Sequence, residues 1–220
     1  MIPTPVCIVN FKSYPNATGR NALTLAKICD KVSQATNTQI IICVQTADIP
    51  LIAKSVKIPV FAQNVDPYEA GAHTGWVLAE NLKEHGAQGT LLNHSEHKLS
   101  IDVLKKCLLR AKAAHLLTIV CAETSEEARL VASLKPDAIA IEPPELIGSD
   151  ISVSSAKPEL IEQSVRAVSF VPILCGAGIH TKDDVSKAIK LGAKGILVSS
   201  GVVNSPNPEK ALKELVSGLR

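Results

Sequence analysis

The chain has 220 residues, of which 46% are hydrophobic and 20% charged, so it can bury a substantial core and should not be disordered. Its formal net charge of +2 gives no electrostatic footprint for nucleic acid or an anionic membrane surface. Aromatic residues make up only 3% and are scattered, and no apolar run approaches the roughly 18 residues of a membrane span, which excludes base-stacking surfaces and membrane crossing.

Eight short apolar runs alternate with longer amphipathic stretches. The expected strands begin near Pro5, Gln39, Ile58, Gly89, Leu117, Asp137, Phe170 and Lys194. Most are unbroken apolar runs, such as residues 40–44 and 196–198, which is typical of parallel strands covered on both faces. Because each run is followed by a crossover, we predict a single (β/α)8 TIM-barrel domain over residues 1–220, with a doubly wound open sheet as the alternative.

Three crossovers carry specific helix signals. Thr124 and Glu127 have the spacing of a capping box, in which the Thr124 oxygen accepts the Glu127 amide and the Glu127 side chain reaches back. Asn207 stands before Pro208, which predicts a capped helix that starts with proline. After Ser100, apolar residues recur at helical spacing and predict one buried face, formed by Ile101, Leu104, Leu108 and Ala111.

The cysteines and the N-terminus indicate a reducing compartment. All six cysteines stand alone, without a C-x-x-C pair or the spacing of zinc ligands. Four of them lie in expected strands and should pack there as small hydrophobic groups, namely Cys7, Cys43, Cys121 and Cys175. The first residues contain no basic stretch followed by an apolar segment, so we expect no signal peptide and a cytoplasmic protein.

Polar or small residues end five of the expected strands. The motifs, in chain order, are Asn10-Phe11-Lys12, Asn93-His94-Ser95-Glu96, Glu142-Pro143-Pro144, Gly176-Ala177-Gly178 and Ser199-Ser200-Gly201. In a barrel of this class, catalytic groups come from the carboxyl ends of several strands. We therefore expect Lys12, His94 and Glu142 to converge beside two loops of small residues.

Each of these elements has a chemical interpretation. Glu142 could act as a general base if burial raises its pKa. Lys12 suits a developing oxyanion, and His94 could move protons between neighbouring oxygens. The two small-residue loops allow backbone amides to approach a phosphate. Any one of these residues alone would usually be a solvated side chain, so the interpretation depends on their convergence.

Two weaker patterns are also present. His94 and His97, with Glu96 between them, could bind a metal ion, but a pair without a third ligand is a weak signal and we expect no metal. Residues 176–178 begin like a dinucleotide-binding fingerprint, yet Thr181 stands where the third glycine is needed. A turn is therefore the better interpretation of that loop.

The motifs together resemble the triosephosphate isomerase family, in the short form typical of archaea, over essentially the whole chain. Asn10-Phe11-Lys12 is similar to the N-x-K motif of the family, and His94-Ser95-Glu96 is similar to its H-S-E motif. Residues 142–149 resemble the catalytic base and its lid, and residues 71–75 resemble the protruding interface loop. The loops after the seventh and eighth strands resemble the phosphate-binding loops.

This resemblance implies a cofactor-free isomerase that interconverts dihydroxyacetone phosphate and D-glyceraldehyde 3-phosphate. It implies that Glu142 is the catalytic base, that His94 and Lys12 act on the substrate oxygens, and that Glu96 positions both. Asn10 would assist Lys12, and Ile147 and Leu197 would press on the Glu142 carboxylate. The phosphate would be held, largely through backbone amides, by Gly148, Gly178, Ser199 and Ser200.

The resemblance also implies a homo-oligomer, either a dimer of the family type or a tetramer, in which Thr74 reaches toward a neighbour's Lys12. The chain departs from the family pattern after the lid, where Asp150 replaces a common glycine. Because a carboxylate near the phosphate would repel it, we expect Asp150 to point away. His97 and Lys98 stand where an arginine is common, which leaves the ion pairing next to the site open.

Three other functions fit parts of the pattern. An isomerase of indole or histidine biosynthesis would share the phosphate loops, and a glycoside hydrolase could use Glu96 and Glu142 as its two carboxylates. The scarcity of aromatic residues opposes both. A catalytically dead relative that acts as a binding subunit is opposed by the complete set of Lys12, His94 and Glu142.

Overall fold

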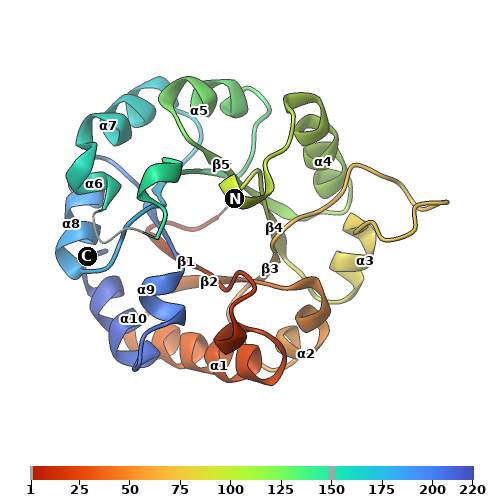
Figure 1. The fold of residues 1–220 in the computed structure, drawn as a ribbon, viewed down its shortest axis with the longest axis horizontal. Helices are drawn as coiled ribbons and strands as arrows, with labels where there is room; N and C mark the ends of the chain where they lie inside the picture. The colour runs from red at the N-terminus through yellow and green to blue at the C-terminus, as the bar shows by residue number, and fades with distance from the viewer. Residues whose placement is uncertain (1, 149–151) are drawn as a thin grey trace.

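In a computed structural model that describes residues 2–148 and 152–220, eight parallel strands form a closed barrel inside a ring of helices (Figure 1). The strands are β1 (Val6–Asn10), β2 (Gln39–Val44), β3 (Val60–Ala62), β4 (Gly89–Leu92), β5 (Leu117–Ala122), β6 (Ala138–Ile141), β7 (Ile173–Cys175) and β8 (Gly195–Val198). Val6 of β1 pairs with Gln39 of β2 on one side and with Gly195 of β8 on the other. This closure confirms the predicted barrel, and the open-sheet alternative is wrong.

Helices cover the outside of the barrel. In the described residues they are α1 (Gly19–Thr36), α2 (Ile49–Ala53), α3 (Ala79–Glu84), α4 (Ile101–Ala113), α5 (Ser125–Ala132), α6 (Val153–Ala156), α7 (Pro158–Ala167), α8 (Lys182–Lys190), α9 (Ser200–Val203) and α10 (Pro208–Ser217). Short 3₁₀ turns are formed by Pro15–Ala17, Thr46–Asp48, Ser95–His97 and Pro144–Leu146. None of the helices in this part of the chain is long and apolar enough to cross a membrane.

Successive strand residues point alternately into the barrel and toward the helices. In β1, Val6 and Ile8 belong to the interior cluster, whereas Cys7 and Val9 pack with the residues beneath the helices. Both faces of each strand are therefore covered by protein, which explains why the strands read as unbroken apolar runs. The interior is closed by side chains such as Phe61, so the site must lie at an end of the barrel.

The strand cysteines confirm the packing prediction. All six cysteines of the chain are free and buried. Cys43 and Cys121 lie in the barrel interior, and Cys7 and Cys175 lie on the helix side of their strands. Burial raises the pKa of the Cys7 thiol to about 12, because a thiolate there would lose its hydration.

The helix signals are confirmed only in part. Asn207 caps α10 by accepting the Lys210 amide, as expected, but Ile101 at the start of α4 is exposed. Thr124 Oγ1 accepts a hydrogen bond from the Glu127 amide at 3.1 Å, but the Glu127 carboxylate accepts the Glu123 amide instead of the Thr124 amide. The predicted capping box is therefore half formed, because the Glu127 carboxylate is used in the site described below. A complete box caps α8, where Thr181 pairs with Asp184.

The segment between β3 and α3 extends away from the barrel at the right of Figure 1. It contains the expected protruding loop, residues 71–75, and its aromatic side chains gather. The ring of Tyr68 stacks on His73 with centroids 4.4 Å apart and lies 4.9 Å from that of Trp76. The expectation that the aromatic residues stay scattered is therefore wrong for this segment, where Trp76 is 51% exposed.

Candidate active site

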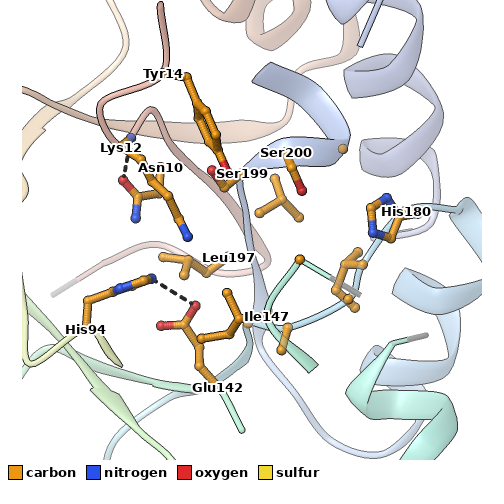
Figure 2. Close-up of a pocket in the computed structure, with 17 residues that line it drawn as sticks. Asn10, Lys12, Tyr14, His94, Glu142, Ile147, His180, Leu197, Ser199 and Ser200 are labelled. Carbon is orange, nitrogen blue, oxygen red and sulfur yellow. Dashed lines mark hydrogen bonds and ion pairs between the residues drawn. The ribbon is translucent and has the colours of Figure 1, made fainter. Parts of the chain in front are cut away.

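Two adjoining cavities lie at the carboxyl ends of the strands. The first, of about 40 Å³, is lined by residues that follow β1, β4, β6, β7 and β8. The second, of about 320 Å³, is lined by residues that follow β1 to β4. Asn10, Lys12 and His94 line both cavities. Figure 2 shows the first cavity, in which the predicted Lys12, His94 and Glu142 converge from separate strands.

Glu142 directly follows β6 and is only 3% exposed. Burial raises the pKa of its carboxyl to about 7, although a hydrogen bond from the Cys121 thiol and the charge of Lys12 act in the opposite direction. Its Oε2 atom is buried and has no hydrogen-bond partner. A carboxylate with little hydration and a free oxygen is a strong base at neutral pH.

Gly176, the first residue after β7, sets the position of the Glu142 side chain. A Cβ atom at residue 176 would lie 2.4 Å from Glu142 Cγ, closer than atoms pack in proteins. The sequence interpretation placed this glycine in a phosphate loop and missed its contact with Glu142. A glycine directly after a strand is a signal for such a close approach.

His94 follows β4 and turns its two ring nitrogens to different partners. The Glu96 amide donates a hydrogen bond to Nδ1 at 3.1 Å, so Nδ1 is an acceptor and the proton of the neutral ring is on Nε2. Nε2 lies 3.7 Å from Glu142 Oε1, the pair joined by a dashed line in Figure 2. Burial, with the charge of Lys12 adding to it, lowers the pKa of His94 to about 4. The imidazole is therefore a neutral donor at physiological pH.

Lys12 follows β1 in a strained backbone conformation, with φ at +49°. Its amide is bound by Asn10 Oδ1 at 3.0 Å, and its carbonyl accepts a hydrogen bond from Gln63 Nε2 at 2.9 Å. Its ammonium pairs with Glu96 Oε1 at 2.7 Å. Glu96 thus contacts both Lys12 and His94, as the resemblance implied.

Asn93 anchors the loop that carries His94, and the sequence interpretation gave it no role. Its backbone has φ at +59° and its side chain is buried. Its Nδ2 donates to Cys121 O at 2.9 Å and to Glu127 Oε1 at 3.0 Å, while its Oδ1 accepts the Leu99 amide at 3.0 Å. The base of the His94 loop is therefore tied to β5, next to the thiol that contacts Glu142.

Lys98 forms the ion pairs next to the site that the sequence analysis left open. Its ammonium lies 2.7 Å from Glu127 Oε1 and 3.0 Å from Glu123 Oε1. Burial tends to raise the pKa of the Glu127 carboxyl. The hydrogen bonds that the carboxylate accepts from Lys98, the Glu123 amide and Asn93 outweigh this effect, so the pKa is lowered. The carboxylate stays ionised and joins the loops after β4 and β5.

The opposite end of the first cavity is formed by the loops after β7 and β8. Gly178, Ser199 and Ser200 line it as predicted, and Ile147 and Gly148 line it from the segment after β6. Leu197, the third residue of β8, lines it as well. Positive φ angles of +66° at Gly178 and +73° at Gly148 explain why glycine suits both positions.

Tyr14 and His180 also line this end, and the sequence interpretation overlooked them. Both lie a few residues beyond a strand, and the hydrophobic pattern of a sequence does not predict the path of a loop. The predicted lid continues from Glu142 through the 3₁₀ turn Pro144–Leu146 to Gly148. Ser149 and Asp150 lie outside the described residues, and the expectation for Asp150 stays a prediction.

The residues of the described chain suggest no metal centre. Within residues 2–148 and 152–220, no group of three or more His, Cys, Asp and Glu side chains is arranged to hold a metal ion. His97 lies on the exposed side of its turn, while His94 faces Glu142. The site offers instead a buried base, a neutral imidazole and an ammonium group at the same cavity. This arrangement suits proton abstraction next to a carbonyl group.

The sequence matches known proteins over nearly its whole length. A family model described as Triosephosphate isomerase matches residues 5–217. The chain is 45% identical to the triosephosphate isomerase of Methanothermus fervidus over 217 residues, which cover 97% of this chain and 98% of that protein. It is 46% identical to the triosephosphate isomerase of Methanobacterium bryantii, with 97% and 96% covered, and 45% identical to that of Methanopyrus kandleri, with both chains fully covered.

Proposed function

The chain belongs to the triosephosphate isomerase family, and from this premise we propose that Glu142, His94 and Lys12 are the residues that perform its reaction. The protein interconverts dihydroxyacetone phosphate and D-glyceraldehyde 3-phosphate through an enediolate, a step of glycolysis and gluconeogenesis. The reaction moves one proton between adjacent carbons and one between their oxygens. It therefore needs a base, a donor to the oxygens and a positive charge near them.

Glu142 removes the carbon-bound proton beside the carbonyl and returns it to the neighbouring carbon. The observation that carries this assignment is its buried carboxylate, whose Oε2 has no partner and whose pKa is raised to about 7. A base with this pKa is ionised in a large fraction of molecules at neutral pH and still holds a proton well. Ile147 and Leu197 line the same cavity, which supports their role in keeping water from the carboxylate.

His94 donates from Nε2 to the substrate oxygens and passes a proton between them. The hydrogen bond from the Glu96 amide to Nδ1 supports this tautomer, and the lowered pKa of about 4 supports a neutral ring. A neutral donor can give its proton to one oxygen of the enediolate and regain one from the other. The imidazole then starts each turnover in the same state.

Lys12 stabilises the negative charge that develops on the enediolate oxygens. Its pairing with Glu96 at 2.7 Å and the hydrogen bond that its backbone amide donates to Asn10 Oδ1 support a fixed position at the cavity wall. A preorganised charge of this kind costs no reorganisation as the reaction proceeds. The phosphate group is held at the opposite end by Gly148, Gly178, Ser199 and Ser200, mainly through backbone amides.

A coupled assay with D-glyceraldehyde 3-phosphate tests the assignment of the base. Glu142→Asp shortens the side chain and withdraws the carboxylate from the carbon, so kcat should fall at least a hundredfold. The same assay with an added chelator should give the wild-type rate. Loss of activity only on chelation would contradict the proposed metal-free mechanism, and a fully active Glu142→Asp variant would contradict the assignment of the base.

We also propose that the active protein is a homo-oligomer in which Thr74 of one subunit approaches Lys12 of the next. Thr74 is exposed on the segment that projects from the barrel in Figure 1. The second cavity, beside Lys12 and lined by polar residues such as Gln45 and Gln63, has room for such a loop. Analytical ultracentrifugation of the wild type and Thr74→Arg tests this, because the bulky charge should lower the oligomer mass.

A tetramer is the assembly that we propose, with residues 1–220 forming one catalytic domain of each subunit in the cytoplasm. Leu109 on α4 is 59% exposed and Leu130 on α5 is 52% exposed, which supports a second apolar contact face beyond the projecting loop. The free cysteines support a reducing compartment. Light scattering would distinguish four subunits from two.

A further inference from the structure

The projecting arm of the molecule, residues 67–76, has few polar contacts with the barrel. Figure 1 shows it extending outward beside α3 and α4. Among the described residues, its backbone hydrogen bonds are internal, such as the one from the His73 amide to Gly71 O at 2.9 Å. The arm is closed at its base, where the Asp66 amide donates to Val77 O at 2.9 Å. An exposed segment with so few attachments would open easily unless side chains held it.

Arg110, near the end of α4, contacts the arm from both sides. Its Nη1 lies 2.9 Å from Glu69 Oε1, where the chain enters the arm. Its Nη2 pairs with Glu80 Oε1 in the first turn of α3, where the chain returns to the barrel. The Arg110 side chain is 19% exposed, and its Nε is buried without a hydrogen-bond partner. One guanidinium thus joins the two ends of the arm to α4.

The stability of the fold alone does not explain this arrangement. The side chains of Glu69 and Glu80 are 80% and 49% exposed, and ion pairs with such exposed partners contribute little to stability. A buried Nε without a partner is unfavourable. What the two pairs achieve is geometric, because the rigid fork of arginine directs separate nitrogens to two carboxylates. They fix both ends of the arm and so restrict the conformations of its tip.

The tip of the arm carries Thr74, the residue that we propose to approach Lys12 of a neighbouring subunit. If the arm became ordered only on docking, its loss of conformational entropy would weaken the association. An arm ordered beforehand avoids this cost. The stacking of Tyr68 on His73 stiffens the arm internally, but both rings belong to the arm. The contacts of Arg110 orient it relative to the barrel.

We propose that Arg110 is a positioning residue, which acts through Glu69 and Glu80 to hold the arm in the conformation that docks beside Lys12 of a neighbouring subunit. This inference rests on the proposed function, in which the arm forms part of the assembly. Arg110 lines neither of the two cavities, so it acts on the reaction only through the arm. No covalent bond changes.

Trp76 reports directly on the arm, because it is the only tryptophan of the chain and stands close to Thr74 in the sequence. Its time-resolved fluorescence anisotropy is measured in dilute protein with the Thr74→Arg substitution, which keeps the arm free of a neighbour. In this background Arg110→Gln should increase the fraction of the anisotropy that is lost through fast local motion. Arg166→Gln is the matched control and should change nothing, since Arg166 pairs with Glu162 at 3.5 Å within α7.

Three further variants separate a loss of the contacts from a general disturbance of α4. Glu69→Gln and Glu80→Gln each remove one ion pair at an exposed position, so both proteins should fold and each arm should loosen less than in Arg110→Gln. Arg110→Lys keeps the charge without the fork and should lie between the wild type and Arg110→Gln. The proposal is overturned if Trp76 is as immobile in Arg110→Gln and in both glutamate variants as in the parent protein.

Sedimentation velocity and the coupled assay connect the arm to the reaction. Without the Thr74 substitution, Arg110→Gln should raise the dissociation constant of the assembly about tenfold, because its arm must be ordered on docking. At high protein concentration kcat should equal that of the wild type, and activity should be lost on dilution at about tenfold higher concentration. Arg166→Gln should match the wild type in both measurements.

The two kinds of measurement have separate outcomes. A looser arm with an unchanged dissociation constant would overturn the positioning role of Arg110. A wild type that is a fully active monomer would overturn the proposed oligomer and the docking step with it, while the anisotropy of Trp76 would still show whether Arg110 orders the arm.

Discussion

The carboxyl ends of β4, β6 and β8 meet at one cavity, but the buried polar groups that follow β4 differ in hydrogen bonding from those that follow β6 and β8. After β4, the Asn93 amide group uses both its oxygen and its nitrogen, and His94 Nδ1 accepts a backbone amide. After β6 and β8, Glu142 Oε2 and Ser199 Oγ are buried without partners. The polar groups after β4 are hydrogen-bonded within the protein, whereas two buried polar atoms after β6 and β8 have no partner in it.

This difference separates two uses of buried polarity. A buried network with every group bonded fixes a geometry and adds to stability. Buried groups without partners lower stability, and costs of this kind are concentrated at functional sites. The β4 region should therefore respond to mutation mainly through stability, and the β6 and β8 regions mainly through activity.

The largest effect is expected for Glu142→Gln. The amide keeps the size of the side chain but cannot accept the carbon-bound proton, so kcat should fall about a thousandfold or more. The coupled assay checks this, with Glu159→Gln as a control because Glu159 is an exposed carboxylate on α7. A kcat for Glu142→Gln within tenfold of the wild type would show that the unpartnered oxygen is not the base.

Gly176→Ala and Gly89→Ala form a matched pair with similar clashes in different regions. The new methyl group would lie 2.4 Å from Glu142 Cγ in the first case and 2.4 Å from the Phe61 ring in the second. Both should destabilise the protein by about 1–3 kcal/mol, measured by urea unfolding. Only Gly176→Ala should also lower kcat, by about a hundredfold, because it displaces the base. Equal losses of kcat in the two folded variants would contradict a positioning role for Gly176.

Asn93→Ala should affect stability more than catalysis. It removes three hydrogen bonds, leaves Cys121 O and the Leu99 amide without a partner and places alanine at a positive φ, for a combined loss of about 3 kcal/mol. Asn37→Ala is the control for backbone strain, because exposed Asn37 also has a positive φ, of +50°. A loss no larger for Asn93→Ala than for Asn37→Ala would mean that the side-chain bonds contribute nothing.

The sequence predicted the barrel, and it predicted that Lys12, His94 and Glu142 converge at one cavity, because both depend on local patterns. Strands covered on two faces must be apolar, and catalytic groups interrupt those runs at their ends, so Lys12, His94 and Glu142 stood out. Thr124 and Glu127 show the limit of this approach. Their spacing predicted a closed capping box, but Lys98 and Asn93 from a distant loop bind the Glu127 side chain.

Tertiary packing also explains what the sequence could not predict. The close contact of Gly176 with Glu142 joins two residues that are 34 positions apart in the chain, and it depends on the pairing of β6 with β7. The lack of a partner for Ser199 Oγ depends on where every neighbouring donor and acceptor lies. The gathering of Tyr68, His73 and Trp76 depends on the course of one loop. None of these leaves a periodic signal.

The smallest net effect is expected in the pH dependence of stability, where the two regions oppose each other. Burial raises the pKa of Glu142 from 4.5 to about 7, so its contribution to stability is present below pH 4.5 and lost as the pH rises to about 7. Burial lowers the pKa of His94 from 6.5 to about 4, so its contribution is present above pH 6.5 and lost as the pH falls to about 4. Between pH 4.5 and 6.5 the loss of stability from Glu142 and the gain from His94 should nearly cancel, so the free energy of unfolding should change little with pH.

Single variants should expose each contribution. Relative to the wild type, Glu142→Gln should gain stability as the pH rises from 4.5 to 8, by about 3 kcal/mol. His94→Gln should gain a similar amount, about 3 kcal/mol, in the opposite direction, as the pH falls from 7 to 4. Urea unfolding at several pH values measures both, and only the change with pH is compared, because each substitution also alters packing. Parallel pH curves for the two variants would show that the cavity does not hold a neutral imidazole beside a carboxylate of raised pKa.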